Sequence, residues 1–480
     1  MKQLKKDPLS VSTDVAPPID LSRVGDSRVL LGLMAPMMTV VLNWTLFSVA
    51  ILAVREEFSL ADDMTSWLLS ALILAIMMFT PLYGSLGDGI DKKTLLLIGL
   101  GVFLAGSAIA MSALNLPMLM LGRAVQGMGS ASVAPLSIAL ISELFPANER
   151  GKALGTWGSI APIFGMVGPL LGGFLVDQVN WRFIYLPVFL TGGIAFYAIW
   201  RYVPQIRTKT DPQFLRRFDW GGVLFMSLAT ISTVFFVSSR PITGVDGLQD
   251  WRLFVPAVTF ITIFIVWEKR QTNPFVQLDL FQSKMFRFAS ICAALWMFTV
   301  PGSVDFLMTL YLRDIRGLTT SSIGILLMVG SGAFMITLRF GGILADRWGS
   351  RWPVVIGSSV QLLTVLYFAN LPETVPLSFL VAGIIVHGLA SALSMAALHR
   401  AAMSEVSPTQ MGMAAGLYSM VRFSGSVLGV SLIGALLQQA MASMETPIQA
   451  FQAMYGFLAI MVAVFILFGW QLKVKGEASA

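Results

Sequence analysis

Runs of about 20 apolar residues recur along almost the whole of this 480-residue sequence, and their length limits what the chain can fold into. An α-helix needs a run of that length to cross the hydrocarbon core of a bilayer. Only 12% of the residues are charged, whereas a soluble globular chain has about one quarter. The chain has too little polar surface for a soluble protein of its size, so we predict an all-α membrane protein.

Charged, proline and glycine residues divide the sequence into fourteen expected transmembrane spans. They cover residues 29–54, 65–86, 94–114, 116–142, 153–175, 183–203, 219–240, 251–267, 286–312, 321–345, 352–371, 376–398, 411–440 and 448–472. An even number of spans places both ends of the chain on the same side of the membrane.

The cations test this division, because loops on the cytoplasmic side of a membrane are enriched in Lys and Arg. If the first residue lies inside, inner segments carry 23 of the 32 Lys and Arg residues. Outer segments carry six, which are Arg55, Arg182, Arg240, Arg252, Arg313 and Arg316. We therefore predict a multi-pass protein of the cell inner (plasma) membrane, with cytoplasmic tails at residues 1–28 and 473–480. The first tail is polar and basic, which is not typical of a signal peptide.

The residue types present do not favour other classes of protein. The single Cys292 excludes a disulfide scaffold, and His387 and His399 are too few for a histidine-rich metal site. There is no Walker-type phosphate loop and no Ser/His/Asp set near a membrane face. The scattered cations form no stripe for nucleic acid, although the net charge is +6. We expect no enzyme, no metal and no cofactor, and a membrane enzyme or a receptor is the less favoured alternative.

The sequence contains a duplicated polar motif. GSLGDGIDKK (84–93) follows the second expected span, and GGILADRWGSR (341–351) follows the tenth. Two six-span halves joined directly would place the copies six spans apart, whereas they lie eight apart. We therefore predict a bundle at 29–203, a linker with two extra spans at 204–285, and a second bundle at 286–472. Internal repeats are typical of transporters with a central site between two moving halves.

In each copy, small residues would let two helices approach closely, and a carboxylate can interact with a helix N-terminus or nearby cations. Such contacts would hold one gate state until substrate or proton favours the other. An ordinary solvated Gly-Asp turn is the alternative for one copy, and two copies at equivalent places make it less favoured.

Taken together, the motifs resemble those of the major facilitator superfamily, and within it the fourteen-helix drug:proton antiporter group. The resemblance covers residues 29–472. The family's loop pattern is matched by Gly84, Leu86, Asp88, Lys92 and Lys93, and again by Gly342, Leu344, Asp346, Arg347, Gly349 and Arg351. LGRAVQGMGSAS matches the fourth-helix motif through Arg123, Gln126, Gly127 and Gly129. GMVGPLLGG matches the antiporter motif of the fifth helix through Gly165, Gly168, Pro169, Gly172 and Gly173.

The resemblance implies the major facilitator fold, with two six-helix bundles plus two linker helices, and alternating access to a central site. It also implies gate roles for the loop residues, a part in proton transfer for Arg123, and a bend at the antiporter motif that resists leak. Two alternatives stay open. For Arg123, the alternative is that its side chain snorkels outward. For the antiporter motif, the alternative is that the glycines serve only generic close packing.

Few charges lie inside the expected spans, and each of them is informative. Asp305 follows a helix-weakening Pro-Gly pair and is the only clear carboxylate in a span interior, so it is the candidate titrating site for proton coupling. Arg422 lies near mid-membrane and needs a carboxylate or carbonyl partner, whereas Arg339 can snorkel. His387 is either a proton contact or a neutral packing histidine. Static ion pairs are the alternative for Asp305 and Arg422.

The first span departs from the antiporter group, whose members usually carry an aspartate where this chain has Asn43. An amide can hydrogen-bond a substrate but carries no proton at physiological pH, which argues against proton coupling through this span. Aromatic side chains adapt to varied apolar substrates, although most of them simply face lipid or other helices. By helix membership, the candidates for a substrate cavity are Asn43, Trp44, Phe47, Gln126 and Phe164.

The sequence thus predicts a monomeric secondary transporter that exports amphipathic or lipophilic small molecules across the bilayer in exchange for protons. A facilitator, or an exporter dedicated to one endogenous metabolite or lipid, is the alternative within transport.

Overall fold

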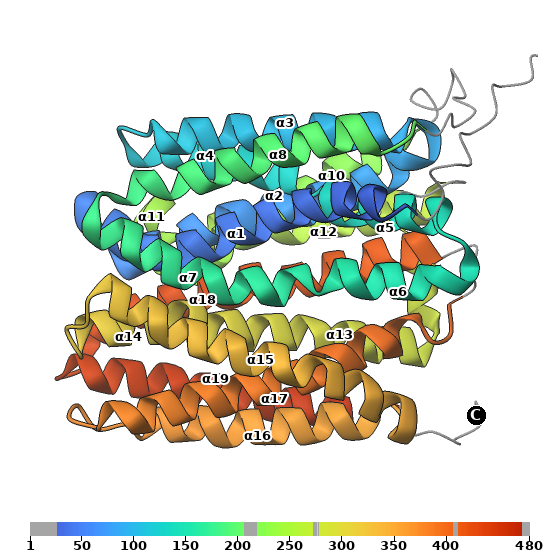
Figure 1. The fold of residues 1–480 in the computed structure, drawn as a ribbon. Coiled ribbons are helices and arrows are strands. Elements are labelled where there is room, and N and C mark those ends of the chain that lie inside the picture. Colours follow the sequence, from blue (N-terminus) through green and yellow to red (C-terminus); the bar gives the residue numbers. More distant parts are fainter. Residues whose placement is uncertain (1–25, 206–217, 272–275, 277, 407–410, 473–480) are drawn as a thin grey trace, which may run out of the picture.

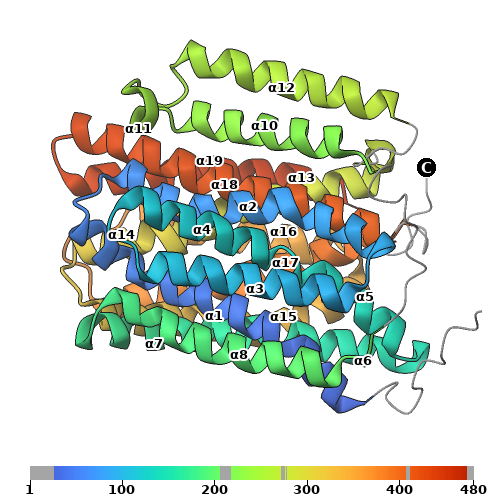
Figure 2. The ribbon, with the colours of Figure 1, turned by 90° about the horizontal axis from the view of Figure 1, so that it is seen from above.

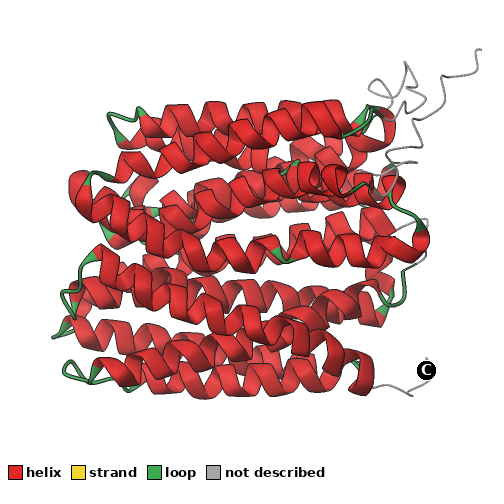
Figure 3. Ribbon diagram, viewed as in Figure 1, coloured by secondary structure: helices red, strands yellow, loops and turns green. Residues whose placement is uncertain are grey.

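The computed structural model describes residues 26–205, 218–271, 276, 278–406 and 411–472. Within these ranges the regular elements are helices and no strand is present (Figure 3). Fourteen helical segments are long and apolar enough to cross a membrane. The predicted fold class and the predicted number of spans are therefore confirmed.

Several spans consist of two or three consecutive helical elements. The first six spans are α1 (Ser27–Glu57), α2 (Asp62–Gly89), α3 (Lys92–Met111), α4 (Leu116–Ser130) with α5 (Val133–Leu144), α6 (Ala147–Gly158) with α7 (Ile160–Gln178), and η2 (Trp181–Ile184) with α8 (Tyr185–Tyr202). The next elements are α10 (Trp220–Val237), the short α11 (Arg240–Thr243), and α12 (Trp251–Arg270). The last are η3 (Leu278–Gln282), α13 (Lys284–Val300) with η4 (Pro301–Met308) and α14 (Thr309–Asp314), α15 (Thr320–Trp348), α16 (Arg351–Ala369), α17 (Leu377–Met403), α18 (Met411–Ser443) and α19 (Pro447–Gly469).

The spans lie side by side, so the molecule has two ends (Figure 1). Helix α1 begins and α19 finishes at the same end, on the right of Figure 1, which we call the tail end. Helices α1 and α14 finish at the opposite end, which we call the far end.

The helices form two groups. Helices α1 to α8 pack mainly on one another and form the first half, and α13 to α19 do the same and form the second half. Two seams join the halves, because α2 packs along α18 and α7 packs along α15. Helices α10 and α12 pack together at the side of the molecule, with α10 against α2 and α18 (Figure 2). The linker pair therefore covers one seam and leaves the other uncovered.

Close packing of α3 on α4 fixes the position of the fourth-helix motif. A Cβ added at Gly106 would lie 2.8 Å from the carbonyl carbon of Val125, and one at Gly129 would lie 2.7 Å from the Cα of Phe103. Larger residues would force these backbones apart, because no side chain fits between them. The glycines thereby hold the polar face of α4 inside the first half.

The ninth span changes its helix type at Pro301, where α13 gives way to the π-helical segment η4. Proline lacks the amide hydrogen that would continue the α-helical ladder. Asp305 lies in the middle of η4. The Pro-Gly pair noted in the sequence therefore coincides with a change of backbone. Short π segments are rare and occur frequently at functional sites.

Candidate functional site

At the far end, ion pairs join the two halves. Nη1 of Arg55 at the end of α1 lies 2.6 Å from Oδ2 of Asp314 at the end of α14. Arg313, next to Asp314, pairs in turn with Glu56, next to Arg55. Each half gives one arginine and one acid, so the exchange is reciprocal. We call these four residues the far clamp.

Further contacts close the same end on both seams. Arg55 also pairs with Asp62 at the start of α2, at 2.9 Å, and the backbone amide of Asp62 donates to Oε1 of Gln438 on α18 at 3.0 Å. On the other seam, the backbone amide of Ser321 on α15 donates to Oδ2 of Asp177 on α7 at 2.7 Å. The far end is therefore bonded across both lines of contact between the halves.

The antiporter motif on α7 packs against α1 through two glycines. A Cβ added at Gly172 would lie 2.7 Å from Cγ2 of Val49, and one at Gly168 would overlap the side chain of Thr45. Thr45 also donates from Oγ1 to the carbonyl of Phe164, at 3.3 Å, which ties α1 to α7 just before the motif. These glycines therefore hold two helices of the same half in close contact.

The same motif meets the second half on another face of α7. A Cβ at Gly173 would lie 2.7 Å from the carbonyl of Thr320 on α15, and one at Gly324 of α15 would overlap the carbonyl of Pro169. Nothing lies within 4 Å of a Cβ at Gly165. The motif thus stands at the seam between the halves, and its glycines differ in what they touch.

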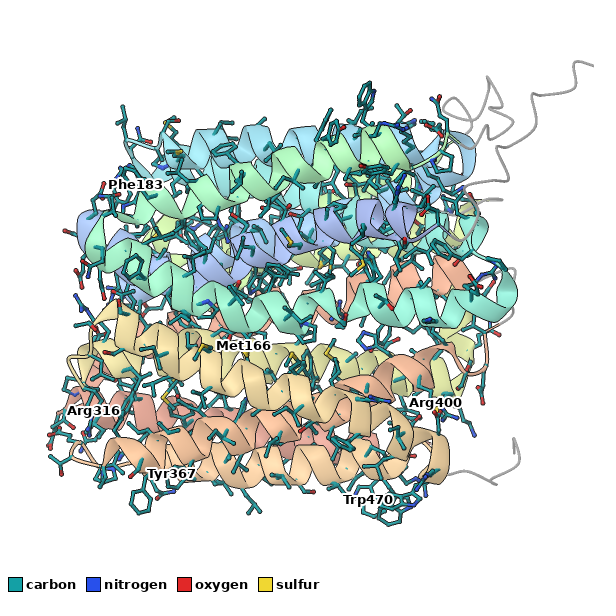
Figure 4. All side chains as sticks on the ribbon, in the orientation of Figure 1. Met166, Phe183, Arg316, Tyr367, Arg400 and Trp470 are labelled. Atoms are coloured by element: carbon teal, nitrogen blue, oxygen red, sulfur yellow. The ribbon has the colours of Figure 1, made fainter. Side chains whose placement is uncertain are left out.

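At the tail end, the ion pairs stay within one half. Nζ of Lys92 at the start of α3 lies 2.8 Å from Oε1 of Glu143 on α5. Oδ1 of Asp346 on α15 lies 2.8 Å from Nε of Arg400 on α17. Figure 4 shows Arg400 at this end and Arg316 at the opposite one. Among contacts between described residues, no ion pair or side-chain hydrogen bond joins the halves here.

The glycines assigned to the loop motif do not make the close contacts expected of them. Nothing lies within 4 Å of a Cβ added at Gly84 or Gly342. The close contacts occur at neighbouring glycines. A Cβ at Gly87, one turn after Gly84, would lie 2.9 Å from a leucine of α5, and a Cβ at Gly341, one residue before Gly342, would lie 2.9 Å from a carbonyl of α17. The expectation for Gly84 and Gly342 is wrong in this conformation, because both face away from the neighbouring helices.

The remaining loop-motif residues have local partners or face outward. Nε of Arg351 donates to the carbonyl of Leu472 at 2.5 Å, and Nζ of Lys93 donates to that of Trp200 at 2.9 Å. Arg347 is exposed. Asp88 belongs to α2, and its side chain lies outside the described part of the chain.

A buried polar network lies inside the first half. Arg123, only 1% exposed, donates from Nη1 to Oε1 of Gln126 at 3.1 Å and from Nε to the carbonyl of Leu68 at 3.3 Å. Nε2 of Gln126 donates to Oδ1 of Asn43 at 3.1 Å and to Oγ of Ser107 at 2.9 Å. Asn43 and Gln126, predicted as substrate contacts, therefore bond to each other in this conformation.

The predicted aromatic cavity residues occupy different places. Phe47 is fully buried, and its ring centre lies 3.9 Å from Cζ of Arg123. This contact excludes outward snorkelling of Arg123, one of the two readings left open by the sequence. Trp44 packs against a cluster that contains Val427 of the second half, so it lies at the α2–α18 seam. Phe164 is half-buried on α7.

In the second half, the polar side chains cluster around η4. Oγ of Ser303 lies 3.2 Å from Nε2 of His387, and the hydroxyl of Tyr455 donates to the carbonyl of Ser303 at 3.2 Å. Nδ1 of His387 has no partner among the described residues. Asp305 is half-buried, and it forms no hydrogen bond or ion pair with a described residue.

Helix contacts set the relative depth of Asp305 and Arg422. A Cβ at Gly425 of α18 would lie 2.6 Å from the carbonyl carbon of Ala294 on α13, and the contact repeats one turn further along both helices. Asp305 is eleven residues beyond Ala294, whereas Arg422 is three residues before Gly425. At about 1.5 Å per residue, Asp305 therefore lies about 20 Å nearer the far end than Arg422.

Arg123 lies closer to Asp305 in depth. It bonds to Leu68 on α2, and Oγ of Ser70, two residues further, lies 2.9 Å from Oγ of Ser431 on α18. This level is within about two helical turns of Asp305 along the helix axis. The structure thus places Arg123 and Asp305 at similar depth in opposite halves and brings neither arginine into contact with Asp305.

Comparison with known proteins gives the family. The sequence pattern described as Major Facilitator Superfamily matches residues 33–430 and, a second time, residues 288–479. The chain belongs to this superfamily. It is therefore a secondary transporter of small molecules embedded in the membrane, and not an enzyme, as the sequence predicted.

Relatives within the superfamily agree with that assignment. Multidrug resistance protein Stp of Mycobacterium tuberculosis is 30% identical over 397 residues, which are 82% of this chain and 73% of that protein. Multidrug resistance protein 3 of Bacillus subtilis is 25% identical over 412 residues, which are 85% of this chain and 79% of that protein. The crystal structure of a POT family transporter in complex with a thioalcohol conjugated peptide has a TM-score of 0.70 at 12% identity, covering 93% of this chain and 97% of that one. The last similarity shows the shared fold alone.

Sequence reasoning missed the far clamp of this superfamily member. It counted Arg55 and Arg313 only as cations of outer segments. A signal was present, because the first span ends in Arg55-Glu56 and the ninth ends in Arg313-Asp314. These are equivalent spans of the two halves, so a duplicated arginine-acid pair at the same place could have predicted a reciprocal contact.

Proposed function

We propose that this chain exports amphipathic or lipophilic small molecules in exchange for protons. The observation that carries the proposal is the different pairing at the two ends of the molecule. Among the described residues, ion pairs join the halves at the far end, and the ion pairs of the tail end, Lys92–Glu143 and Asp346–Arg400, each lie within one half. A transporter built in this way opens its centre to the tail side while the far side is closed. The moving units are residues 29–203 and 286–472, with the linker at 204–285.

In this proposal the tail end is cytoplasmic. The support is the uneven distribution of Lys and Arg. Of the 32 residues, 23 fall on segments that the span order assigns to the same side of the membrane as the two tails. The closed far end then faces outside, and the conformation is the one that takes up substrate from the cytoplasm. One chain holds both halves and the interface between them, so a monomer suffices.

Asp305 is proposed as the group that carries the proton. An exchanger needs a site that gains a proton on one side and loses it on the other, and an arginine that comes near favours loss of that proton. Asp305 has no described partner, and Arg123 lies at similar depth in the opposite half. Movement of the halves would therefore change the distance between these two charges. His387, bonded two residues away at Ser303, is a second proton-binding candidate, and Arg422 would act on Asp305 only in another conformation.

The antiporter motif and the loop motif are proposed to set the balance between the two gate states. Gly173 and Pro169 touch α15 across the seam, so their packing must change when the far end opens. Asp346 holds α15 to α17 at the tail end. The substrate class follows from relatives named as multidrug resistance proteins and from aromatic side chains such as Trp44 at the α2–α18 seam.

A facilitator that equilibrates one compound without proton coupling is the second candidate. Asn43 favours it, because this amide replaces the aspartate of the antiporter group and is engaged by Gln126. An amide cannot take up and release a proton near neutral pH.

Reconstitution into liposomes with an imposed pH gradient distinguishes these functions. Purified protein is tested with chemically varied amphipathic dyes, and dye movement is followed with the gradient on, reversed and collapsed. Accumulation that depends on the gradient supports exchange with protons. Equilibration at the same rate with and without the gradient supports the facilitator and excludes the proposal.

A further inference from the structure

Two sides of α18 are occupied by neighbouring helices. Gly425 packs against α13, and Ser431 bonds to α2. Ser424 lines a cavity of about 150 Å³ together with residues of α10 and α12, on the side of the linker. Because successive helical residues are about 100° apart, Ser424 and Ser431 lie on the same side of α18, about 100–120° from Gly425, and these contacts leave a further face of the helix unassigned.

Arg422 and Ser426 occupy that remaining face. They are one turn apart and therefore share a stripe along the helix. Tyr418, one turn before Arg422, meets the ring of His399 on α17 at a centroid distance of 5.3 Å. The stripe is therefore turned toward α17, and Arg422 itself is half-buried.

Three hydrogen-bonding groups at this place have no partner among the described residues. They are Nε of Arg422, Oγ of Ser426 and Oγ of Ser290, and each of these atoms is buried. Both serines have 0% exposure. Ser290 lies four residues before Ala294, which touches Gly425, so it stands level with Arg422 on the facing helix α13. Groups on two facing helices thus lie at similar depth, and none of the three atoms has a described partner.

The guanidinium of Arg422 has no counter-ion among the described residues. Its Cζ lies 4.5 Å from the ring centre of Phe423, and no described carboxylate pairs with it. The one carboxylate in a described span interior, Asp305, lies about 20 Å further toward the far end. Arg422 lies eleven residues, or about 16 Å along the helix axis, from the start of α18 at the tail end. An arginine at membrane depth without a partner points to a ligand.

We propose that Arg422, Ser426 and Ser290 bind the anionic group, a carboxylate or sulfonate, of a substrate that enters from the tail end. The guanidinium offers paired N–H donors that match such a group, and the two hydroxyls offer further donors. The site rests on the proposed function, because a substrate must pass between the halves to reach it. It assigns to Arg422 the recognition of charge on the substrate.

The test uses two fluorescent probes with the same ring system, anilinonaphthalene sulfonate and uncharged phenylnaphthylamine. Equilibrium binding of each is measured by fluorescence on full-length protein in phosphatidylcholine vesicles. Arg422→Gln is expected to weaken binding of the sulfonate about tenfold and to leave the uncharged probe within about twofold. Arg422→Lys keeps the charge and should retain part of the sulfonate affinity, while Ser426→Ala should lose about threefold.

Arg339→Gln is the matched control, because it removes another span cation that is exposed on α15. It should bind both probes as the wild type does. Equal weakening of both probes by Arg422→Gln, or unchanged sulfonate binding, would overturn the proposal. So would loss of the Arg422-dependent difference when phosphatidylglycerol replaces phosphatidylcholine, since the occupant would then be a lipid headgroup.

Binding and transport separate this inference from the proposed function. If gradient-driven transport of both probes fails in the wild type while Arg422 still discriminates the sulfonate, the anion site stands and the export proposal fails. If the wild type transports the uncharged probe but Arg422→Gln binds the sulfonate normally, the export proposal stands and the anion site fails.

Discussion

The far end and the tail end of this transporter contain similar charged side chains but pair them differently. At the far end, Arg55 and Glu56 of the first half bond to Asp314 and Arg313 of the second. At the tail end, Asp346 bonds within the second half. Charge content alone therefore does not decide whether an end is closed. What decides it is whether each partner belongs to the same half or to the opposite one.

The two tail-end pairs are also related to each other. Lys92 lies in the first loop motif and pairs with Glu143 at the end of the fourth span, whereas Asp346 lies in the second motif and pairs with Arg400 at the end of the twelfth. Those spans occupy equivalent places in the two halves. In each half a charge of the loop motif thus braces the end of the equivalent span, from the start of the third span in one half and from the end of the tenth in the other, without joining the halves.

The largest expected effect concerns Asp305, the proposed proton carrier. Asp305→Asn should abolish gradient-driven accumulation of substrate, because an amide cannot exchange a proton. Probe binding and passive exchange should stay measurable, since Asp305 bonds to no described residue and its loss breaks no contact. Proton flux and dye movement are measured together in proteoliposomes. An Asp305→Asn protein that still drives substrate uphill with unchanged proton stoichiometry would remove Asp305 from the mechanism.

The next effect concerns the seam between α7 and α15. Gly173→Leu should reduce transport more than tenfold and prevent closure of the far end, because a side chain there meets the α15 backbone. Gly168→Leu should also block transport, but through α1 in the same half. Gly165→Leu is the control and should stay within about twofold, since open space surrounds it. Equal activity of Gly173→Leu and Gly165→Leu would show that the seam contact is incidental.

A smaller effect is expected when the charges of the far clamp are exchanged. Partly exposed ion pairs contribute about 0.2–1 kcal/mol, so Glu56→Arg should shift the gate balance about threefold. The double change of Glu56→Arg with Arg313→Glu should restore it. The readout is labelling of Ser70→Cys, below the clamp, by an impermeant maleimide added from the far side, in a Cys292→Ser background. Additive effects of the two single changes would argue against a direct pair.

The smallest effect is expected at the tail end. Asp346→Asn removes an exposed partner of Arg400 and should lower the transport rate about twofold while the amount of folded protein in the membrane is unchanged. Asp88→Asn in the first loop motif should also impair transport. Arg347→Gln, an exposed neighbour, serves as the control. Wild-type rates for both aspartate variants would contradict a gate role for the loop motif.

The spans could be predicted from the sequence because bilayer thickness fixes their length, and Asp305 because a lone carboxylate in an apolar run has few explanations. The far clamp could be predicted only by comparing the ends of equivalent spans, because Arg55 and Asp314 are 259 positions apart and meet only when the halves assemble. The rotation of each helix about its own axis could also not be predicted from the sequence. Gly84 and Gly342 were predicted as contact residues from their place in the motif. In the structure the close contacts occur instead at Gly87 and Gly341, because the rotation of the helix decides which glycine faces a neighbour.

The linker helices give the molecule a covered side and an uncovered side within the bilayer. Helices α10 and α12 shield the α2–α18 seam, whereas side chains along the α7–α15 seam, such as Ile163, Phe174 and Ile336, are exposed. A compound already dissolved in the lipid therefore meets the two lines of contact unequally. Among the described helices, α10 and α12 obstruct approach from the lipid at the α2–α18 seam, whereas no described helix lies over the α7–α15 seam.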